Sequence, residues 1–342
     1  MSQTMLKVED LSAGFQNKKK FIKIIDNISF EVKQGETLCI VGESGCGKSL
    51  TSLSIMGLLP TNGRIANGKI HFIDQDLTTK SMKEMSKIRG NDISMIFQEP
   101  MTSLNPVQPV GKQISEALLT HKKFAKSQAE QQTITLMKLV GIPSPEQRFK
   151  SYPHELSGGM RQRIMIAMAL ACDPKLLIAD EPTTALDVTI QAQILEQMND
   201  LKLKMQMSIL LITHDLGVVS KMADKVIVMY AGQIVEYAEA SELFKHPKHP
   251  YTNGLIASIP TLDSNPNEDL PIIKGRVPSP EDMPQGCRFS SRCPLATDLC
   301  RERAPQLEGD AHQVSCWMYT DQWKGEKKSY DTISAAFAKN PS

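Results

Sequence analysis

The fold is decided by Gly42-Glu43-Ser44-Gly45-Cys46-Gly47-Lys48-Ser49, a stretch of the form G-x-x-x-x-G-K-S. Residues 37–41 before it form an apolar run that predicts a buried strand, and residues 49–59 after it carry apolar side chains at helical spacing. Glycines between a strand and a helix let successive backbone N–H groups turn toward phosphate oxygens, and the helix N-terminus adds partial positive charge there. These flanks favour a phosphate-binding loop over the alternative, a glycine-rich turn followed by a chance Lys-Ser.

Two side chains at the end of this loop predict how it would hold a nucleoside triphosphate. Lys48 is expected to reach the β- and γ-phosphates, and the Ser49 hydroxyl is expected to bind Mg²⁺. The predicted nucleotide site comprises the whole loop and the residue after it, which are Gly42, Glu43, Ser44, Gly45, Cys46, Gly47, Lys48, Ser49 and Leu50.

Composition narrows the class of protein. The chain has 342 residues, and its 39 basic and 38 acidic side chains give a net charge of +1, which offers no support for nucleic acid as the main partner. The longest apolar run, Ile164–Cys172, has nine residues and is far too short for a membrane span. The N-terminus lacks a secretory apolar region. We therefore expect a cytoplasmic chain that touches a membrane only through other proteins.

The residues ahead of the phosphate loop alternate between apolar and polar side chains. This period of two over residues 5–34 predicts an antiparallel sheet that precedes a parallel core, and residues 68–73 predict a further strand of that sheet. Phe15 in this region is a candidate for stacking on adenine, and simple packing within the sheet is an equally good interpretation. After the loop, residues 110–139 have a helical pattern.

Polar side chains end three predicted apolar strands. Gln98 ends the run 93–98 and could reach Mg²⁺ or an attacking water. Asp180 and Glu181 end the run 175–181, where Asp180 suits a Mg²⁺ contact through water and Glu181 suits polarising the attacking water. His214 follows the run 208–213, at the strand end where mononucleotide folds bind their ligand. Each of these residues alone is weak evidence for a functional site, since glutamines and acidic pairs commonly end strands and a lone histidine is usually structural.

A second candidate anion site lies at Leu156-Ser157-Gly158-Gly159-Met160, directly before an apolar helical stretch that runs to Ala171. Ser157, Gly158 and Gly159 at a helix start can offer backbone N–H groups to phosphate. An ordinary N-cap is the alternative.

In this order, the elements resemble one family, the ATP-binding subunits of ABC transporters. The resemblance covers about residues 5–260 and rests on Gly42–Ser49, Gln98, Leu156–Met160, Leu177–Glu181, Ala185–Asp187 and His214, of which the Leu-Ser-Gly-Gly element is specific to the family. The amino-acid sequence of residues 98–106 and 249–252 resembles that of the oligopeptide and dipeptide importer branch of the family. The resemblance implies an α/β P-loop NTPase core with an antiparallel β subdomain and a helical subdomain near residues 90–165.

The resemblance also implies an activity and its partners. Two such subunits would face head to tail, so that the phosphate loop of one and Ser157, Gly158 and Gly159 of the other enclose each ATP. Hydrolysis of ATP with Mg²⁺ would power peptide uptake through two transmembrane permease subunits, supplied by an extracytoplasmic peptide-binding protein. A second related ATPase in a heterodimer and a peripheral position on the cytoplasmic face of the membrane are expected. The apolar residues Met101, Leu104 and Val107 predict that loop 99–109 contacts a permease helix.

Three alternatives are considered. The chain could serve an importer of another small solute such as nickel. A non-transport ABC ATPase acting on ribosomes or DNA usually has tandem cassettes or long coiled coils, and neither is visible. A regulatory subunit without hydrolysis would be expected to lack the base or the switch, yet Glu181 and His214 are both present.

Residues 261–342 are expected to form an extension to an ATPase domain at 1–260. Four of the seven cysteines lie within thirty residues of this proline-rich segment and predict a metal site in place of a core: Cys287, Cys293, Cys300 and Cys316. A helix over 295–303 with Pro294 at its first position would leave Cys293 just outside it. Resemblance to peptide-importer C-terminal regions implies a [4Fe–4S] cluster, with Arg288 and Arg292 offsetting its charge. Zinc, with His312 in place of one sulfur, and four reduced cysteines are the alternatives.

Overall fold

The computed structural model describes residues 3–18, 20–98, 103–183, 187–260 and 271–338. Within them, an antiparallel sheet has the strand order β2-β1-β4-β5. Its strands are β1 (Thr4–Asn17), β2 (Lys20–Lys33), β4 (Gly63–Phe72) and β5 (Gln75–Asp76). The predicted antiparallel sheet is thus confirmed, and the strand expected at 68–73 is the second half of β4.

A second sheet follows the order β11-β10-β9-β3-β8-β7-β6 in the described part of the chain. Strands β9, β3, β8, β7 and β6 are parallel, whereas β10 and β11 are added antiparallel at one edge. The strands span Gln313–Val314 (β11), Gln233–Glu239 (β10), Lys225–Tyr230 (β9), Thr37–Val41 (β3), Ser208–Thr213 (β8), Leu176–Asp180 (β7) and Ile93–Ile96 (β6).

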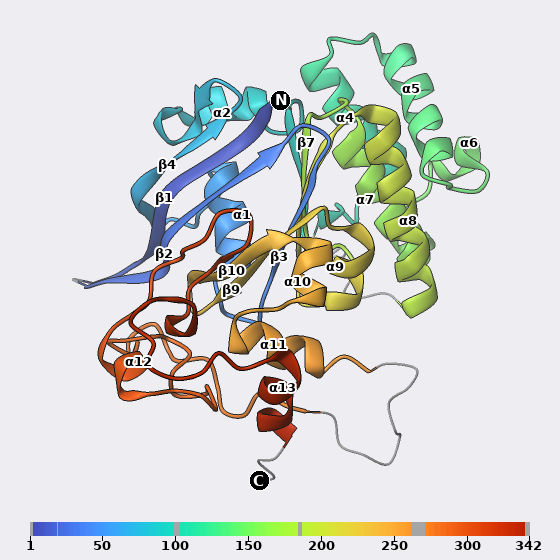
Figure 1. Cartoon of the computed structure of the whole chain (residues 1–342). Helices are drawn as coiled ribbons and strands as arrows, with labels where there is room; N and C mark the ends of the chain where they lie inside the picture. The colour runs from blue at the N-terminus through green and yellow to red at the C-terminus, as the bar shows by residue number, and fades with distance from the viewer. Residues whose placement is uncertain (1–2, 19, 99–102, 184–186, 261–270, 339–342) are drawn as a thin grey trace.

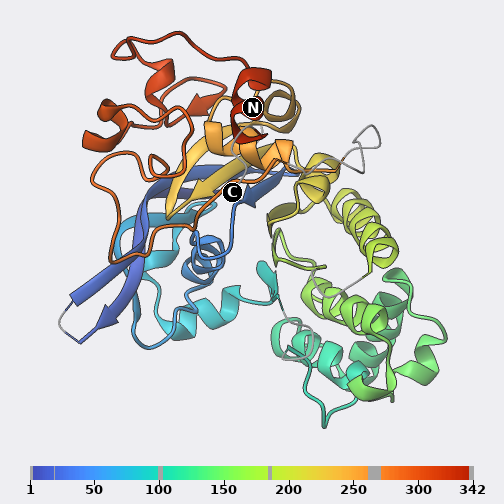
Figure 2. The ribbon, with the colours of Figure 1, turned by 90° about the horizontal axis from the view of Figure 1, so that it is seen from below.

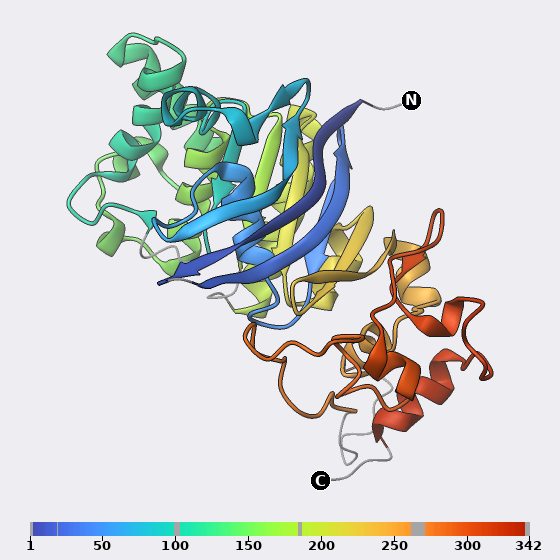
Figure 3. The same cartoon turned by 90° about the vertical axis from the view of Figure 1, so that its left-hand side faces the viewer.

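Both faces of the parallel sheet are buried, which explains why its strands read as continuous apolar runs. Leu38 and Ile40 of β3 pack into a core shared with the antiparallel sheet. Cys39 and Val41, which alternate with them, pack into a second core formed with the helices. Figure 3 shows the long strands β1 and β2 lying across one face of the parallel strands. The phosphate loop therefore leaves a strand that is fixed from both sides.

The α-helices lie around this framework. They span Lys48–Met56 (α1), Met82–Ile88 (α2), Val110–His121 (α4), Lys126–Leu139 (α5), Pro145–Arg148 (α6), Gly158–Leu170 (α7), Val188–Met205 (α8), Leu216–Met222 (α9), Ala240–Lys245 (α10), Pro250–Ala257 (α11), Asp298–Glu302 (α12) and Tyr330–Ala338 (α13). Helices α4 to α8 gather at one end (Figure 1), and residues 271–338 occupy the other end, with the sheets between (Figure 2).

Three local expectations differ from the structure. The helical pattern over 110–139 forms two helices, because the chain turns between α4 and α5, where Lys123 has a left-handed φ of 54°. The strand expected to reach Gln98 ends at Ile96. The helix expected over 295–303 is wrong in extent: α12 begins at Asp298 with Thr297 as its N-cap, so Pro294 precedes the helix.

Candidate functional site

The phosphate loop connects β3 to α1 and depends on its glycines. Gly47 is the N-cap of α1 and has a φ of 104°, a left-handed conformation that side chains with a Cβ rarely adopt. At Gly42 a Cβ would lie 2.2 Å from the carbonyl oxygen of Met229 on β9. The loop can therefore lie close against the neighbouring strand only with glycine at that position.

Lys48 is buried inside this loop, with 5% of its surface exposed. Its Nζ donates hydrogen bonds to the carbonyl oxygens of Gly42 at 2.6 Å and Glu43 at 3.0 Å. The ammonium group thus stands within the ring of backbone that would surround phosphate oxygens, which is where a phosphate-binding lysine acts.

The first turn of α1 meets the end of β7. Ser49 Oγ donates a hydrogen bond to Asp180 Oδ1 at 3.1 Å, and Ser52 Oγ donates one to Asp180 Oδ2 at 3.4 Å. Burial raises the pKa of Asp180 and the nearby charge of Glu181 raises it further, while the hydrogen bond from Ser49 opposes the rise. A hydroxyl and a carboxylate side by side form the hard oxygen donor set that Mg²⁺ prefers, so these residues fit the metal. Sequence reasoning missed Ser52, although it lies one helical turn from Lys48.

Glu181 brings together the ends of three neighbouring strands. Gln98 Nε2 donates a hydrogen bond to Glu181 Oε2 at 3.1 Å, and His214 Nδ1 lies 3.2 Å from Glu181 Oε1. Glu181 itself has a φ of 46°, a strained conformation for a residue other than glycine. The strand order β8-β7-β6 makes this meeting possible, because parallel strands end at one edge of the sheet.

The other predicted nucleotide contacts belong to elements outside the phosphate loop and the core strand ends. Phe15 pairs with Ile22 of β2 and Gly63 of β4 and packs partly against the core between the sheets. Ser157 caps α7 by accepting a hydrogen bond from the Met160 backbone N–H at 3.3 Å, so the N-cap interpretation is confirmed for its side chain. Ser157 and Gly158 are exposed. Of the resemblance motif Ala185–Asp187, residues 185 and 186 lie outside the described residues.

The four C-terminal cysteines are half-buried and reduced. Burial raises the pKa of Cys287 to about 11 and that of Cys293 to about 12. Across the described residues, no group of three or more His, Cys, Asp or Glu side chains is close enough to hold a metal ion. The arginines expected to offset a cluster charge form other ion pairs: Arg288 pairs with Asp26, and Arg292 pairs with Glu43.

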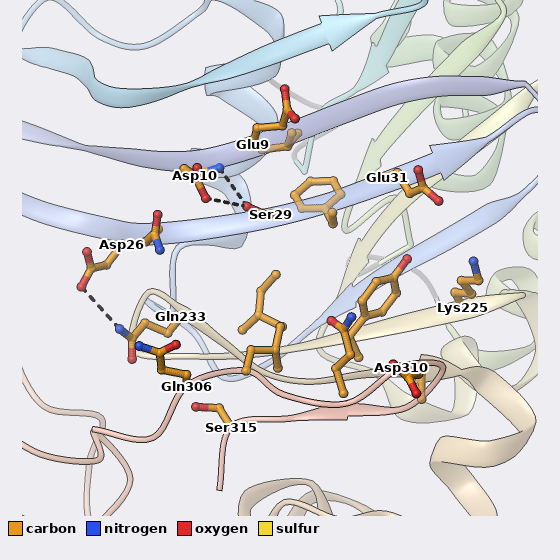
Figure 4. A pocket seen from close by; sticks show the side chains of 18 of the residues that line it. Glu9, Asp10, Asp26, Ser29, Glu31, Lys225, Gln233, Gln306, Asp310 and Ser315 are labelled. Atoms are coloured by element: carbon orange, nitrogen blue, oxygen red, sulfur yellow. Dashed lines mark hydrogen bonds between the residues drawn. The ribbon is translucent and has the colours of Figure 1, made fainter. Parts of the chain in front are cut away.

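A cavity of about 970 Å³ lies apart from the phosphate loop. It lies between β1, β2, β10 and residues 304–315, as Figure 4 shows, and none of the predicted site residues lines it. Its acidic side chains include Asp10, which accepts a hydrogen bond from Ser29 Oγ, and Asp26, which accepts one from Gln233 Nε2. Cavity size therefore does not mark the candidate site in this fold.

Comparison with known proteins identifies the family. The ABC transporter family profile matches residues 25–184, and the profile of the oligopeptide/dipeptide transporter C-terminal region matches residues 235–300. The oligopeptide transport ATP-binding protein AppD of Bacillus subtilis is 55% identical over 322 residues, which cover 93% of this chain and 98% of the relative. The chain belongs to the ATP-binding proteins of oligopeptide and dipeptide ABC transporters. The dipeptide transport ATP-binding protein DppD of Haemophilus influenzae is 54% identical over 91% of this chain and 94% of the relative.

Solved structures agree with this ABC transporter membership at the level of the fold. A dimeric ATP-binding cassette bound to ADP and Pi matches with a TM-score of 0.63 and 24% identity, covering 69% of this chain and 99% of that chain. The cbiO1 protein of Clostridium perfringens, part of an ABC transporter complex, matches with a TM-score of 0.62 and 28% identity over 71% of this chain and 91% of its own. As an ABC transporter ATP-binding protein, this chain is an ATPase. No helix in the described ranges is long and apolar enough to cross a membrane.

Proposed function

We propose that this chain hydrolyses ATP to power the uptake of di- and oligopeptides through a membrane transporter. The observation that carries the proposal is the carboxylate of Glu181, held between Gln98 and His214 beside the Ser49–Asp180 pair. A carboxylate fixed next to a phosphate loop suits activation of water for attack on the γ-phosphate. The peptide cargo is supported by the relatives, whose names describe oligopeptide and dipeptide transport.

Each residue of the site has a separate role in the proposed hydrolysis of ATP. Lys48 and the loop N–H groups would bind the β- and γ-phosphates, and Ser49 and Asp180 would hold Mg²⁺, Asp180 through water. When bound, Mg²⁺ offsets the negative charge that develops on the phosphates. Glu181 would orient the attacking water and accept its proton. Gln98 and His214 would keep the Glu181 carboxylate directed toward that water, and Phe15 would lie against the adenine.

The proposal is tested by uptake of a radiolabelled dipeptide in cells that depend on this chain for the transporter. Uptake is expected with the parental chain and is expected to fall to background with Glu181→Gln. Exchange of an exposed acid on α8, Glu196→Gln, is the matched control and should leave uptake unchanged. Uptake of other solutes such as nickel, with no dipeptide uptake, would contradict the peptide assignment.

We propose that two ATPase subunits enclose ATP head to tail, with a second, related ATPase as the partner. Ser157 and Gly158 are exposed at the start of α7, and a Cβ at Gly158 would meet no atom within 4 Å. This open helix start can approach the γ-phosphate held by the partner subunit. ATP would then join the two subunits, and its hydrolysis would release them.

Permease contact is supported by an apolar groove of about 340 Å³ between α1, β6 and α7. Phe97, 41% exposed, and Met168 line it. In the predicted contact loop, Val107 is 81% exposed, but Leu104 is buried and unable to serve as a contact; residues 99–102 lie outside the described residues. We propose that a cytoplasmic helix of one of two permease subunits occupies the groove, which places this chain peripherally on the cytoplasmic face of the membrane. An extracytoplasmic peptide-binding protein would deliver the cargo.

We also propose that residues 261–342 form an extension to an ATPase domain at 1–260, whose helical subdomain spans about 90–165. Within this extension, we propose a [4Fe–4S] cluster, with zinc as the alternative, held by Cys287, Cys293, Cys300 and Cys316. The Cys287 backbone N–H donates to the Cys300 carbonyl oxygen at 2.7 Å, which brings these two parts of the segment together. As placed, the thiols do not fit a metal, because no three of them form a close group. The side chains would have to turn toward one another, and we assign the cluster no step in hydrolysis.

A further inference from the structure

A side chain of the cysteine segment, residues 287–293, reaches the phosphate loop. Arg292 Nη1 donates a hydrogen bond to Glu43 Oε2 at 2.9 Å, and this ion pair joins residues that are 249 positions apart. Only 5% of the Arg292 side chain is exposed, against 29% for Glu43. An ion pair with so little solvent access is screened far less than a surface pair.

Arg292 is held firmly on its other side. Its Nε donates to the Lys274 carbonyl oxygen at 2.8 Å, and its Nη2 donates to the Ile273 carbonyl oxygen at 3.0 Å. Nη1 also lies 3.4 Å from the Tyr230 hydroxyl. A planar guanidinium with all three nitrogens engaged has little freedom to move, so it can fix the position of the carboxylate that it contacts.

The main chain of Glu43 is fixed as well. Its N–H donates to the Tyr251 hydroxyl at 2.9 Å, and Tyr251 is fully buried. Phe289, from the same segment as Arg292, packs with ring centroids 5.4 Å from Tyr251 and 5.1 Å from Tyr230. The segment therefore supports the loop both by an ion pair and through an aromatic cluster.

This arrangement bears on phosphate binding in two ways. The Glu43 carbonyl oxygen accepts a hydrogen bond from Lys48 Nζ at 3.0 Å, so displacement of Glu43 would displace a group that contacts the phosphate-binding lysine. The Glu43 carboxylate also carries a negative charge in a loop expected to receive the polyanion ATP, and like charges repel. Arg292 compensates that charge.

We propose that Arg292 is a positioning residue of the phosphate loop, acting through Glu43, so that docking of residues 287–293 raises the affinity for ATP. The inference rests on the proposed ATP site. By linkage, ATP must favour docking of this segment by the same factor. The C-terminal region thereby acts on nucleotide binding directly, with or without a metal at its cysteines.

A double-mutant cycle on the full chain tests this, with the equilibrium binding of the fluorescent nucleotide mant-ATP and Mg²⁺ as the readout. Arg292→Gln should raise the Kd about fivefold or more in the parental background, in line with directly interacting residues. In a Glu43→Gln background the same exchange should change the Kd less than about twofold, because the carboxylate is gone. Arg292→Lys, which retains the charge, should recover part of the loss.

Two controls distinguish the positioning role of Arg292 from a general destabilisation of the docked segment 287–293. Arg288→Gln breaks the ion pair of the same segment with Asp26 and leaves the Arg292–Glu43 ion pair in place, so it should lower thermal stability and raise the Kd less than Arg292→Gln does. Hydrogen exchange of residues 287–293 should slow on addition of ATP in the parental chain and stay unchanged in Arg292→Gln. An equal rise in Kd in both Glu43 backgrounds, or an unchanged Kd in Arg292→Gln, would overturn the proposal. A parental chain that fails to bind mant-ATP would overturn the ATP site itself and the inference with it.

Discussion

Gln98 donates a hydrogen bond to Glu181 across 3.1 Å and so connects the loop after β6 with the strained end of β7. Gln98 directly follows Phe97, which lines the groove proposed for the permease. A change at Glu181 on hydrolysis therefore has a short path to that groove, through one hydrogen bond and one peptide bond. The predictions below test this site and the regions attached to it.

Glu181→Gln should keep ATP binding and lower the turnover of ATP about a hundredfold or more, because the amide cannot accept the proton of the attacking water. Phosphate release measures turnover, and size-exclusion chromatography with ATP should detect a trapped dimer. Glu196→Gln on α8 is the matched control. Hydrolysis at the parental rate by Glu181→Gln would refute the base assignment.

Lys48→Ala should raise the Kd for ATP about tenfold to a hundredfold, because a charge-assisted contact to the phosphates is lost. Titration with mant-ATP measures the Kd, and Lys87→Ala on the exposed face of α2 should leave it unchanged. Parental affinity in Lys48→Ala would exclude the loop as the phosphate site.

Gly158→Asp should block hydrolysis of the ATP held by the partner, because the new carboxylate would face phosphate across the dimer. Gly158→Ala is the matched control for folding, since a Cβ there meets no atom of this chain within 4 Å. Mixing Gly158→Asp with a partner whose phosphate loop is disabled assigns each site. If the exchange weakened ATP binding equally in the monomer, the head-to-tail arrangement would be wrong.

Acid should destabilise the fold through His249. This side chain is fully buried, and burial lowers the pKa of His249 from 6.5 to about 3. Between pH 6.5 and 3 the unfolded chain binds the proton that the folded chain excludes, so the free energy of unfolding falls as pH falls, by at most about 1.4 kcal/mol per pH unit.

The His249 Nδ1 also accepts a hydrogen bond from the Tyr251 backbone N–H at 3.0 Å. His249→Asn can keep this cap without titrating. Urea unfolding from pH 6 to 4 should show a shallower decline in the variant; an unchanged slope would disprove the role.

Anaerobically purified protein should be brown and contain about four irons per chain if the C-terminal cysteines hold a [4Fe–4S] cluster. Cys293→Ser should lower the iron content, while Cys172→Ser, a change in the buried core, should not. Elemental analysis measures both. Colourless protein with one zinc would exclude iron and keep a metal site, and metal-free protein would exclude both.

Much of the site could be predicted from local sequence because its parts are local. The loop from Gly42 to Ser49 needs its glycines at set positions along the chain, and a buried parallel strand such as 176–180 shows itself as an apolar run. The four cysteines were evident from spacing, but spacing says nothing of where their side chains point, and the helix expected at 295–303 proved shorter.

The sequence by itself determined that a phosphate loop lies between a strand and a helix, and which polar residues end the core strands. Only the tertiary structure decided that Glu181 stands between Gln98 and His214, because that meeting depends on the strand order β8-β7-β6. It also decided that Arg292 holds Glu43. Contacts between distant residues arise from the packing of whole elements, and no periodicity along the chain records which surfaces will meet.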